Sequence, residues 1–166
     1  MKLGVIADTH GLMRSEALDA LRGVDHIIHA GDIGGMHVID ALRGIAPVTF
    51  VEGNNDDGEG LAIVRVRIGA LRVLLTHILP RPHKPHRRVL ESLTREPADV
   101  VVFGHSHLPH NEIAGSVRYF NPASAGPRRF DYPMSIGVIE DGNARHIALD
   151  ERSIAALDKR MNQLSR

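Results

Sequence analysis

Short apolar runs alternate with stretches of helical periodicity in the first third of the chain. The apolar runs cover residues 3–7, 25–29 and 47–51, and the helical stretches cover residues 15–23 and 36–42. This alternation of strand and helix predicts a parallel sheet with right-handed crossover connections. We expect Ser15 to cap the first helix and Gly44 to end the second.

The pattern changes after Gly60. Residues 61–68 alternate apolar side chains with arginines, and residues 71–76 return after a Gly-Ala pair. This predicts a β-hairpin. A proline-rich basic loop over residues 79–88 then leads into a predicted helix from about residue 87 to 94.

Residues 100–103 are β-branched or aromatic throughout, which predicts a strand buried on both faces, as in a covered parallel sheet. Later runs are shorter and separated by turn residues, which predicts antiparallel strands of a second sheet. These runs cover residues 112–114, 117–120, 134–139 and 145–149. Residues 151–164 form an amphipathic helix that is expected to pack on the body or on another subunit, which leaves a homo-oligomer open.

The composition is ordinary for a globular protein: 43% of the 166 residues are hydrophobic, and the length predicts one domain over residues 1–166. The formal net charge is zero, which disfavours a nucleic-acid partner. No apolar run is long enough for a membrane helix, and residues 1–7 read as a strand rather than as a signal peptide. The absence of cysteine excludes disulfides, thiolate zinc sites and cysteine nucleophiles, and fits a cytoplasmic location.

Polar side chains follow five of the predicted strands, at the point where each strand ends. Those able to bind a metal are Asp8, His10, Asp32, Asn54, His77, His105 and His107. Open α/β sheets place their ligands at the carboxyl ends of strands, so we expect these residues to gather. Carboxylate, amide and imidazole donors without thiolate suit Mn²⁺, Fe²⁺, Zn²⁺, Co²⁺ or Ni²⁺ better than Ca²⁺ or Mg²⁺. Seven ligands are too many for one such ion, but one bridging carboxylate would let them fill two sites.

In their order along the chain, these motifs resemble the signature of the calcineurin-like metallophosphoesterases. The motifs are Asp8-x-His10, Gly31-Asp32, Gly53-Asn54-Asn55-Asp56, His77 and Gly104-His105-Ser106-His107. The chain length, the first motif and the segment Asn121-Pro122-Ala123-Ser124 are most similar to the small YfcE-type phosphodiesterases, relatives of the retromer scaffold subunit. The resemblance implies an α/β fold of the metallo-dependent phosphatase type, a four-layer sandwich of two packed mixed β-sheets flanked by helices.

The resemblance also implies how the ligands are shared. A first ion would be held by Asp8, His10, Asp32 and His107. A second ion would be held by Asp32, Asn54, His77 and His105. Two divalent ions bring four positive charges, of which Asp8 and Asp32 cancel two, so the site would attract hydroxide and phosphate. Two ions roughly 3.5–4 Å apart can activate a bridging hydroxide for in-line attack at phosphorus, which implies hydrolysis of small phosphoesters, with phosphodiesters as the expected substrates.

Asn55 departs from the family signature. It stands where many members carry the histidine thought to protonate the leaving oxygen, and Asp56 lies where the carboxylate partner of that histidine would be. We take both as candidate catalytic residues. An amide cannot supply a proton, but it can donate a hydrogen bond to a phosphate oxygen, so Asn55 is also a substrate-binding candidate.

Other candidates lie outside the signature. His83 and His86 in the proline-rich loop, and Arg128 and Arg129 after Ser124, are either solvated or reach a phosphate, and His83 and Arg128 are taken as substrate-binding candidates. His29 is either a support for the ligands or a satisfied core histidine. The remaining histidines are interpreted as surface residues: His26, His37, His110 and His146. Two functions other than hydrolysis of small esters stay open, a catalytically weak binding scaffold and a nuclease.

Overall fold

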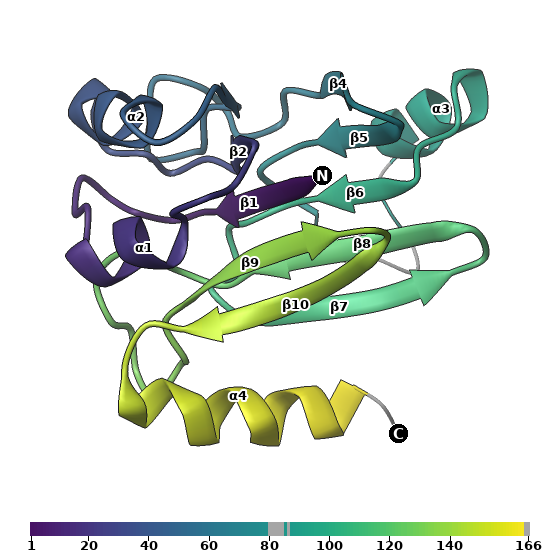
Figure 1. Cartoon of the computed structure of the whole chain (residues 1–166). Coiled ribbons are helices and arrows are strands. Elements are labelled where there is room, and N and C mark those ends of the chain that lie inside the picture. Colours follow the sequence, from purple (N-terminus) through teal and green to yellow (C-terminus); the bar gives the residue numbers. More distant parts are fainter. Residues whose placement is uncertain (80–84, 86, 165–166) are drawn as a thin grey trace.

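Two five-stranded sheets pack face to face in the computed structural model, which describes residues 1–79, 85 and 87–164 (Figure 1). The first sheet has the order β10-β9-β1-β2-β3 and the second the order β4-β5-β6-β8-β7. The strands of the first sheet are β1 (Lys2–Ile6), β2 (His26–His29), β3 (Val48–Phe50), β9 (Ser135–Glu140) and β10 (Asn143–Ala148). The strands of the second sheet are β4 (Val64–Ile68), β5 (Leu71–Leu75), β6 (Val100–Val102), β7 (Pro109–Ala114) and β8 (Val117–Pro122).

In the first sheet β1, β2 and β3 are parallel, as their alternation with helices predicts. The assignment of residues 134–139 and 145–149 to a second sheet is wrong, because β9 pairs antiparallel with β1 and β10 pairs with β9. Packing between the sheets explains this placement. Gly137 of β9 lies against Phe120 of β8, and a Cβ built on Gly137 would come within 2.2 Å of the Phe120 ring. Only a glycine leaves room for that ring here.

In the second sheet, β5, β6 and β8 are parallel, and the hairpins β4–β5 and β7–β8 are antiparallel. The hairpin predicted after Gly60 is therefore confirmed. The strand predicted from the apolar run at 100–103 is also confirmed: β6 lies at the centre of its sheet with a parallel neighbour on each side, and its three residues are buried.

Helices cover the outer face of each sheet, so the predicted four-layer fold is confirmed. On the first sheet lie α1 (Ser15–Ala20) and α2 (Met36–Arg43), whose Leu42 and Ile39 join a core with Ile27 of β2. On the second sheet lies α3 (Arg87–Arg95), whose Val89 packs with Val101. A third core between the sheets joins side chains from both, among them Leu3, Val5, Ile28, Leu75, Val102 and Phe120.

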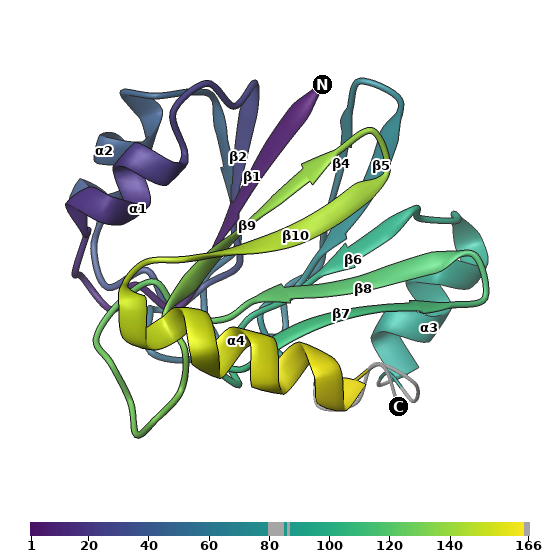
Figure 2. The ribbon, with the colours of Figure 1, turned by 60° about the horizontal axis from the view of Figure 1, so that its bottom comes forward.

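The fourth helix, α4 (Glu151–Leu164), has the bounds that its periodicity predicts. It packs against β7 and β10, the edge strands of the two sheets on one side of the sandwich (Figure 2). Of the two expected positions, the helix therefore takes the one on the body. In the part of the chain that the structure describes, no helix is long and apolar enough to cross a membrane.

The predicted helix boundaries need one correction. Gly44 ends α2 as expected. Ser15 does not cap α1: the N-cap is Arg14, and the Ser15 hydroxyl donates to the neighbouring Glu16 carboxylate at 3.1 Å. A serine one position inside the helix can no longer accept the backbone N–H groups that a cap satisfies.

Candidate metal centre

The polar strand ends meet at one end of the sandwich. Asp8 and His10 follow β1, Asp32 follows β2, and His77 follows β5. The loop after β6 supplies His105 and His107. These strands belong to different sheets, so residues far apart in sequence converge because the carboxyl ends of the parallel strands of both sheets lie together.

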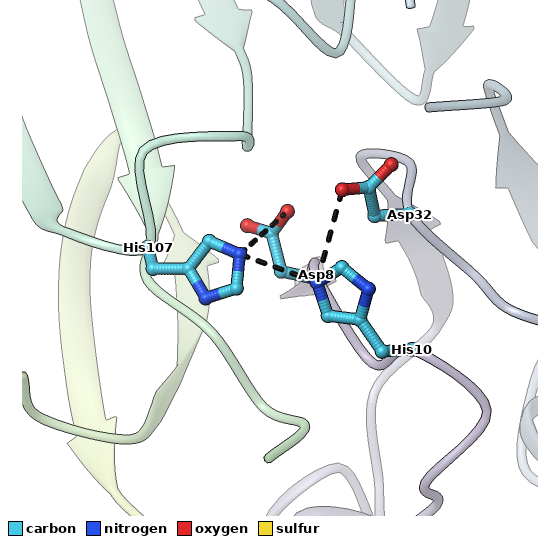
Figure 3. Close-up of side chains that lie close together, drawn as sticks. All are labelled: Asp8, His10, Asp32 and His107. Carbon is cyan, nitrogen blue, oxygen red and sulfur yellow. Dashed lines mark hydrogen bonds and ion pairs between the residues drawn. The ribbon is translucent and has the colours of Figure 1, made fainter. Parts of the chain in front are cut away.

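One group of side chains has the geometry of a metal site. Asp8, His10, Asp32 and His107 each offer a ligand atom, and these atoms all lie within 4.8 Å of one another (Figure 3). The Nε2 atoms of His10 and His107 are 3.2 Å apart, and His107 Nε2 is 3.7 Å from Asp8 Oδ1. These are the four residues expected to share the first ion.

A second group adjoins the first through Asp32. Oδ2 of Asp32 lies 3.7 Å from His10 Nε2, and its Oδ1 lies 3.3 Å from His77 Nε2. Asn54 Oδ1 is 3.2 Å from His77 Nε2 and 2.9 Å from His105 Nδ1. The structure therefore brings all seven candidate ligands into one cluster, with Asp32 between the two groups.

The environment of His77 fits a cation. Its Nδ1 donates to the carbonyl oxygen of Ala30 at 2.7 Å, so in the neutral ring Nε2 carries a lone pair. That lone pair faces two oxygens, Asp32 Oδ1 and Asn54 Oδ1, an arrangement that a proton or a metal ion would stabilise. Oδ2 of Asp8 is buried without a hydrogen-bond partner among the described residues, which also suits a metal ligand.

Five of the seven candidate ligands have left-handed backbone conformations. The φ angles are 54° for Asp8, 47° for His10, 53° for Asp32, 68° for His105 and 57° for His107. Residues other than glycine rarely adopt this region, and such strain collects at functional sites where the surrounding structure enforces it. The tight turns after the strands thus direct both side chains of Asp-x-His and of His-x-His toward one point.

Protonation states follow from burial and from neighbouring charges. Burial raises the pKa of Asp8 to about 7, with the Asp32 carboxylate adding to the effect. Burial also disfavours the charged form of Asp32. The His77 ring, when it is protonated, and the two hydrogen bonds from Asn55 outweigh that effect and hold the Asp32 pKa below its usual range. Burial and the charge of Arg129 lower the pKa of His107 to about 4. A neutral imidazole and an ionised carboxylate are the states that bind metals.

The two candidate catalytic residues, Asn55 and Asp56, hold the loops of the site in place. Asn55 donates its side-chain Nδ2–H to Asp32 Oδ2 at 2.6 Å. Asp56 accepts backbone N–H groups from Ile33, Gly34 and Gly53 at 2.8–3.0 Å, and so ties the loop after β2 to the loop after β3. Gly53 fits only without a side chain, because a Cβ there would lie 2.1 Å from Asp32 Oδ1.

Buried polar groups that no ligand motif identifies support the ligand loops. Asn121 is fully buried; its Nδ2 donates to the Gly104 carbonyl at 2.8 Å and to Ser106 Oγ at 3.2 Å. Ser124 Oγ donates to the Asp8 carbonyl at 2.9 Å. In the sequence, residues 121–124 carry only the family resemblance, and the polar pair Asn121 and Ser124 on either side of Pro-Ala is the one local signal of this supporting role.

His29 takes both of the roles that the sequence leaves open. It is fully buried, and its Nδ1 accepts the Gly31 N–H at 3.2 Å, so its Nε2–H donates to Thr9 Oγ1 at 2.9 Å. Thr9 in turn donates to the Ile33 carbonyl. A satisfied core histidine thereby fixes the Asp8-x-His10 turn to the loop that follows Asp32.

The interpretation of His146 as a surface residue is wrong. Its ring stacks on Phe120 with centroids 4.7 Å apart, and its Nε2–H donates to the Asn121 carbonyl at 2.8 Å. His37 is exposed as expected. His26 and His110 are half-buried, with partners at Thr49 and Glu112 respectively.

The two arginines after Ser124 have different surroundings. Arg128, taken as a phosphate contact, forms an ion pair with Asp150 and donates to the Tyr132 carbonyl, so its charge is already balanced within the fold. Arg129 instead donates from Nη2 to His10 Nε2 at 3.4 Å. His83 and His86 lie outside the described residues.

Comparison with known proteins agrees with this geometry. The model of the calcineurin-like phosphoesterase superfamily domain matches residues 1–143. A probable metallophosphoesterase of Methanothermobacter thermautotrophicus is 34% identical over 152 residues, which cover 86% of this chain and 87% of that protein. The structure of the phosphodiesterase YfcE from Escherichia coli is similar with a TM-score of 0.68 and 26% identity, over 92% of this chain and 96% of that one.

A third similarity concerns the fold alone. The structure of Vps29 from Entamoeba histolytica complexed with zinc aligns with a TM-score of 0.66 and 23% identity, over 90% of this chain and 100% of that one.

Proposed function

The chain belongs to the calcineurin-like phosphoesterase superfamily, and we propose that residues 1–166 act as one domain, a phosphodiesterase that uses two divalent metal ions to hydrolyse small phosphoesters. The observation that carries the proposal is the position of Asp32. Its two carboxylate oxygens face different histidines, His10 on one side and His77 on the other. A carboxylate placed in this way can bridge two ions.

The ligand assignment follows the two adjoining groups. Asp8, His10, Asp32 and His107 would hold one ion. Asp32, Asn54, His77 and His105 would hold the other. These donors are imidazole nitrogens and oxygens without thiolate, which suits Mn²⁺, Ni²⁺, Zn²⁺ or Fe²⁺, and we propose manganese as the first ion to test.

When bound, the two ions would supply an activated water and would neutralise the charge that develops on the phosphoryl oxygens. The two ions carry four positive charges, and the carboxylates of Asp8 and Asp32 neutralise two of them. The site therefore keeps an excess positive charge that attracts an anionic ester. This attraction is local, because the formal net charge of the whole chain is zero. It requires no basic surface, and it therefore favours small esters over nucleic acids.

Asn55 and Asp56 would contribute to catalysis by positioning the metal ligands. The amide of Asn55 holds the Asp32 carboxylate, and an amide has no acidic proton that it could transfer to the leaving group. Asp56 is engaged by three backbone N–H groups and keeps the loops of Asp32 and Asn54 in place. The chain would then leave protonation of the leaving group to water.

A complete set of seven ligands favours catalysis over a role as a binding scaffold alone. We further propose that the protein acts in the cytoplasm, as expected for a chain without cysteine that hydrolyses small phosphoesters. Self-association is compatible with the proposal and is not needed to complete the site, since all seven ligands come from one chain.

The test is hydrolysis of bis(p-nitrophenyl) phosphate by the purified chain, first stripped with a chelator and then reloaded with Mn²⁺, Ni²⁺, Zn²⁺ or Mg²⁺. We expect no turnover after stripping, recovery with at least one transition metal, and two ions per chain in the active form. Binding of two ions without hydrolysis of any diester would support the scaffold instead. Full activity with a single ion per chain would contradict the bridging role of Asp32.

A further inference from the structure

The loop between β8 and β9 is linked by ion pairs at two points. Arg128 forms an ion pair with Asp150, and Asp131 forms one with Arg152, so both partners lie at or near the start of α4. In Figure 2 this loop, coloured green, projects from the body beside the first turn of α4. The two residues between these anchors, Arg129 and Phe130, are both exposed.

Arg129 reaches the metal centre. Its Nη2–H donates to His10 Nε2, the atom that would bind an ion, at 3.4 Å. Among the described residues it has no ion pair, whereas Arg128 beside it has one. When a metal ion binds His10 Nε2, that nitrogen can no longer accept a hydrogen bond from Arg129. The Arg129 guanidinium then keeps an uncompensated positive charge at the rim of the site. An anionic oxygen is the partner that a guanidinium in this position lacks.

Phe130 is unusual in two ways. Its side chain is 82% exposed, more than any other large hydrophobic side chain described. Its φ angle is 51°, in the left-handed region that a bulky residue avoids. Its ring lies 5.5 Å from that of Tyr132, with an interplanar angle of 55°, so one edge is supported while most of the ring faces solvent. The loop therefore holds an aromatic ring in water, in a strained conformation, one residue away from the arginine at the metal centre.

We infer that Arg129 and Phe130 recognise the substrate of the proposed hydrolysis: Arg129 pairs with the phosphoryl group at the centre, and Phe130 contacts a flat aromatic group, aryl or nucleobase, carried by the ester. Successive Cα atoms are about 3.8 Å apart, so the backbone of Phe130 lies beside that of Arg129, close enough for both side chains to contact one ligand. An aromatic ring exposed to solvent can stack on any flat ring of a ligand, regardless of the hydrogen-bonding groups that the ligand ring carries. This inference rests on the proposed function, because it assigns the substrate of the same site.

The experiment measures binding to the manganese-loaded protein by calorimetry, with two phosphonates that are not hydrolysed. Phenylphosphonate and methylphosphonate share the anionic group and differ in the ring. We expect the wild type to bind phenylphosphonate about tenfold more tightly. Phe130→Ala should remove that preference, and Phe130→Tyr should retain it. Arg129→Gln should weaken both ligands by a similar factor and leave their ratio unchanged.

Ile113→Ala is the matched control, since Ile113 is also an exposed apolar side chain, at 59%, but lies on β7. It should change neither affinity. An unchanged ratio of the two phosphonates in Phe130→Ala would overturn the role of Phe130, and unchanged affinities in Arg129→Gln would overturn that of Arg129.

The same proteins separate this inference from the proposed function. If diester hydrolysis occurs in the wild type but the phenyl preference does not depend on Phe130, the recognition role fails and the function stands. If the phosphonates bind as expected but no phosphoester is hydrolysed, the recognition role stands and the proposed function fails.

Discussion

Asn55 and Asp32 are joined by two hydrogen bonds: the backbone N–H of Asn55 donates to Oδ1 of Asp32 at 2.9 Å, and its side-chain Nδ2–H donates to Oδ2 at 2.6 Å. Each oxygen of the proposed bridging carboxylate is therefore oriented by the same residue. Asn55 orients this carboxylate, and its amide has no acidic proton to give to a leaving group. Because Asn55 cannot protonate a leaving group, we expect the rate of hydrolysis to depend strongly on the leaving group.

Without a positioned acid, a poor leaving group must depart as an alkoxide or wait for a proton from water. General acid catalysis typically contributes about 10²–10⁴-fold, so its absence should appear as a steep dependence of rate on the pKa of the leaving group. Aryl diesters should be cleaved much faster than alkyl diesters. A series of diesters with graded leaving groups measures the slope, and Asn55→His should make it shallower if the metal content is preserved.

The histidines of the proline-rich loop provide the alternative source of a proton. A shallow slope in the wild type that steepens in either His83→Ala or His86→Ala would transfer the role of acid to that residue. A shallow slope that persists in both variants would leave no support for this account of Asn55.

Asp32→Asn should abolish hydrolysis and weaken the binding of both ions, because the amide removes a negative charge from two ligand groups at once. His107→Ala should weaken chiefly one ion, since His107 contacts only the group of Asp8 and His10. Metal content by mass spectrometry distinguishes the two variants. Asp40→Asn, at an exposed position on α2, is the control for loss of a carboxylate. Retention of two ions and near-normal activity in Asp32→Asn would exclude a bridge.

Asn121→Ala should lower activity although Asn121 is not a ligand. The substitution leaves the Gly104 carbonyl without its donor and removes a buried amide, at a cost of about 1–3 kcal/mol in the free energy of unfolding. Loss of a group that orients ligands typically lowers metal affinity about 10–100-fold. Titration of the stripped variant with Mn²⁺ measures this affinity, and Asn111→Ala, on β7, is the control for loss of an amide. If Asn121→Ala lost stability but kept its metal affinity, the role would be confined to the fold.

His29 should make the stability of the chain fall in acid. Burial is the main cause that lowers its pKa from 6.5 to about 3. The unfolded chain then binds a proton at His29 between these two values while the folded chain does not, so the contribution of His29 is complete above about pH 6.5 and is lost as the pH falls toward 3. Chemical unfolding of the metal-free protein between pH 4 and 8 measures the slope.

His29→Gln should reduce this slope, because glutamine does not titrate. His146, whose pKa is lowered to about 4 chiefly by burial, contributes with the same sign, so His146→Gln should reduce the slope further in combination. An acid dependence that is identical in the wild type and in both variants would show that neither His29 nor His146 governs it.

Local patterns predicted the elements of the chain well. The hairpin of β4 and β5, the buried strand β6 and the helix α4 each arise from side chains a few residues apart, whose spacing is visible in the sequence. Those patterns do not predict which strands pair with one another in a sheet. β9 pairs with β1 in the first sheet, where Gly137 leaves room for Phe120 across the core, and this contact exists only in the packed structure.

The seven metal-ligand candidates could be predicted from the sequence, because each follows an apolar run and the carboxyl ends of parallel strands meet at one edge of a sheet. Tertiary structure alone decided which neighbouring groups serve that cluster. Arg128 and Arg129 are adjacent and chemically alike, yet Asp150, 22 residues away from Arg128, pairs with Arg128, whereas Arg129 donates to His10. In the same way Asn121 becomes a support because the fold places the β6 loop against it. Charge balance and hydrogen bonding between distant segments are properties of the folded chain, and no local pattern encodes them.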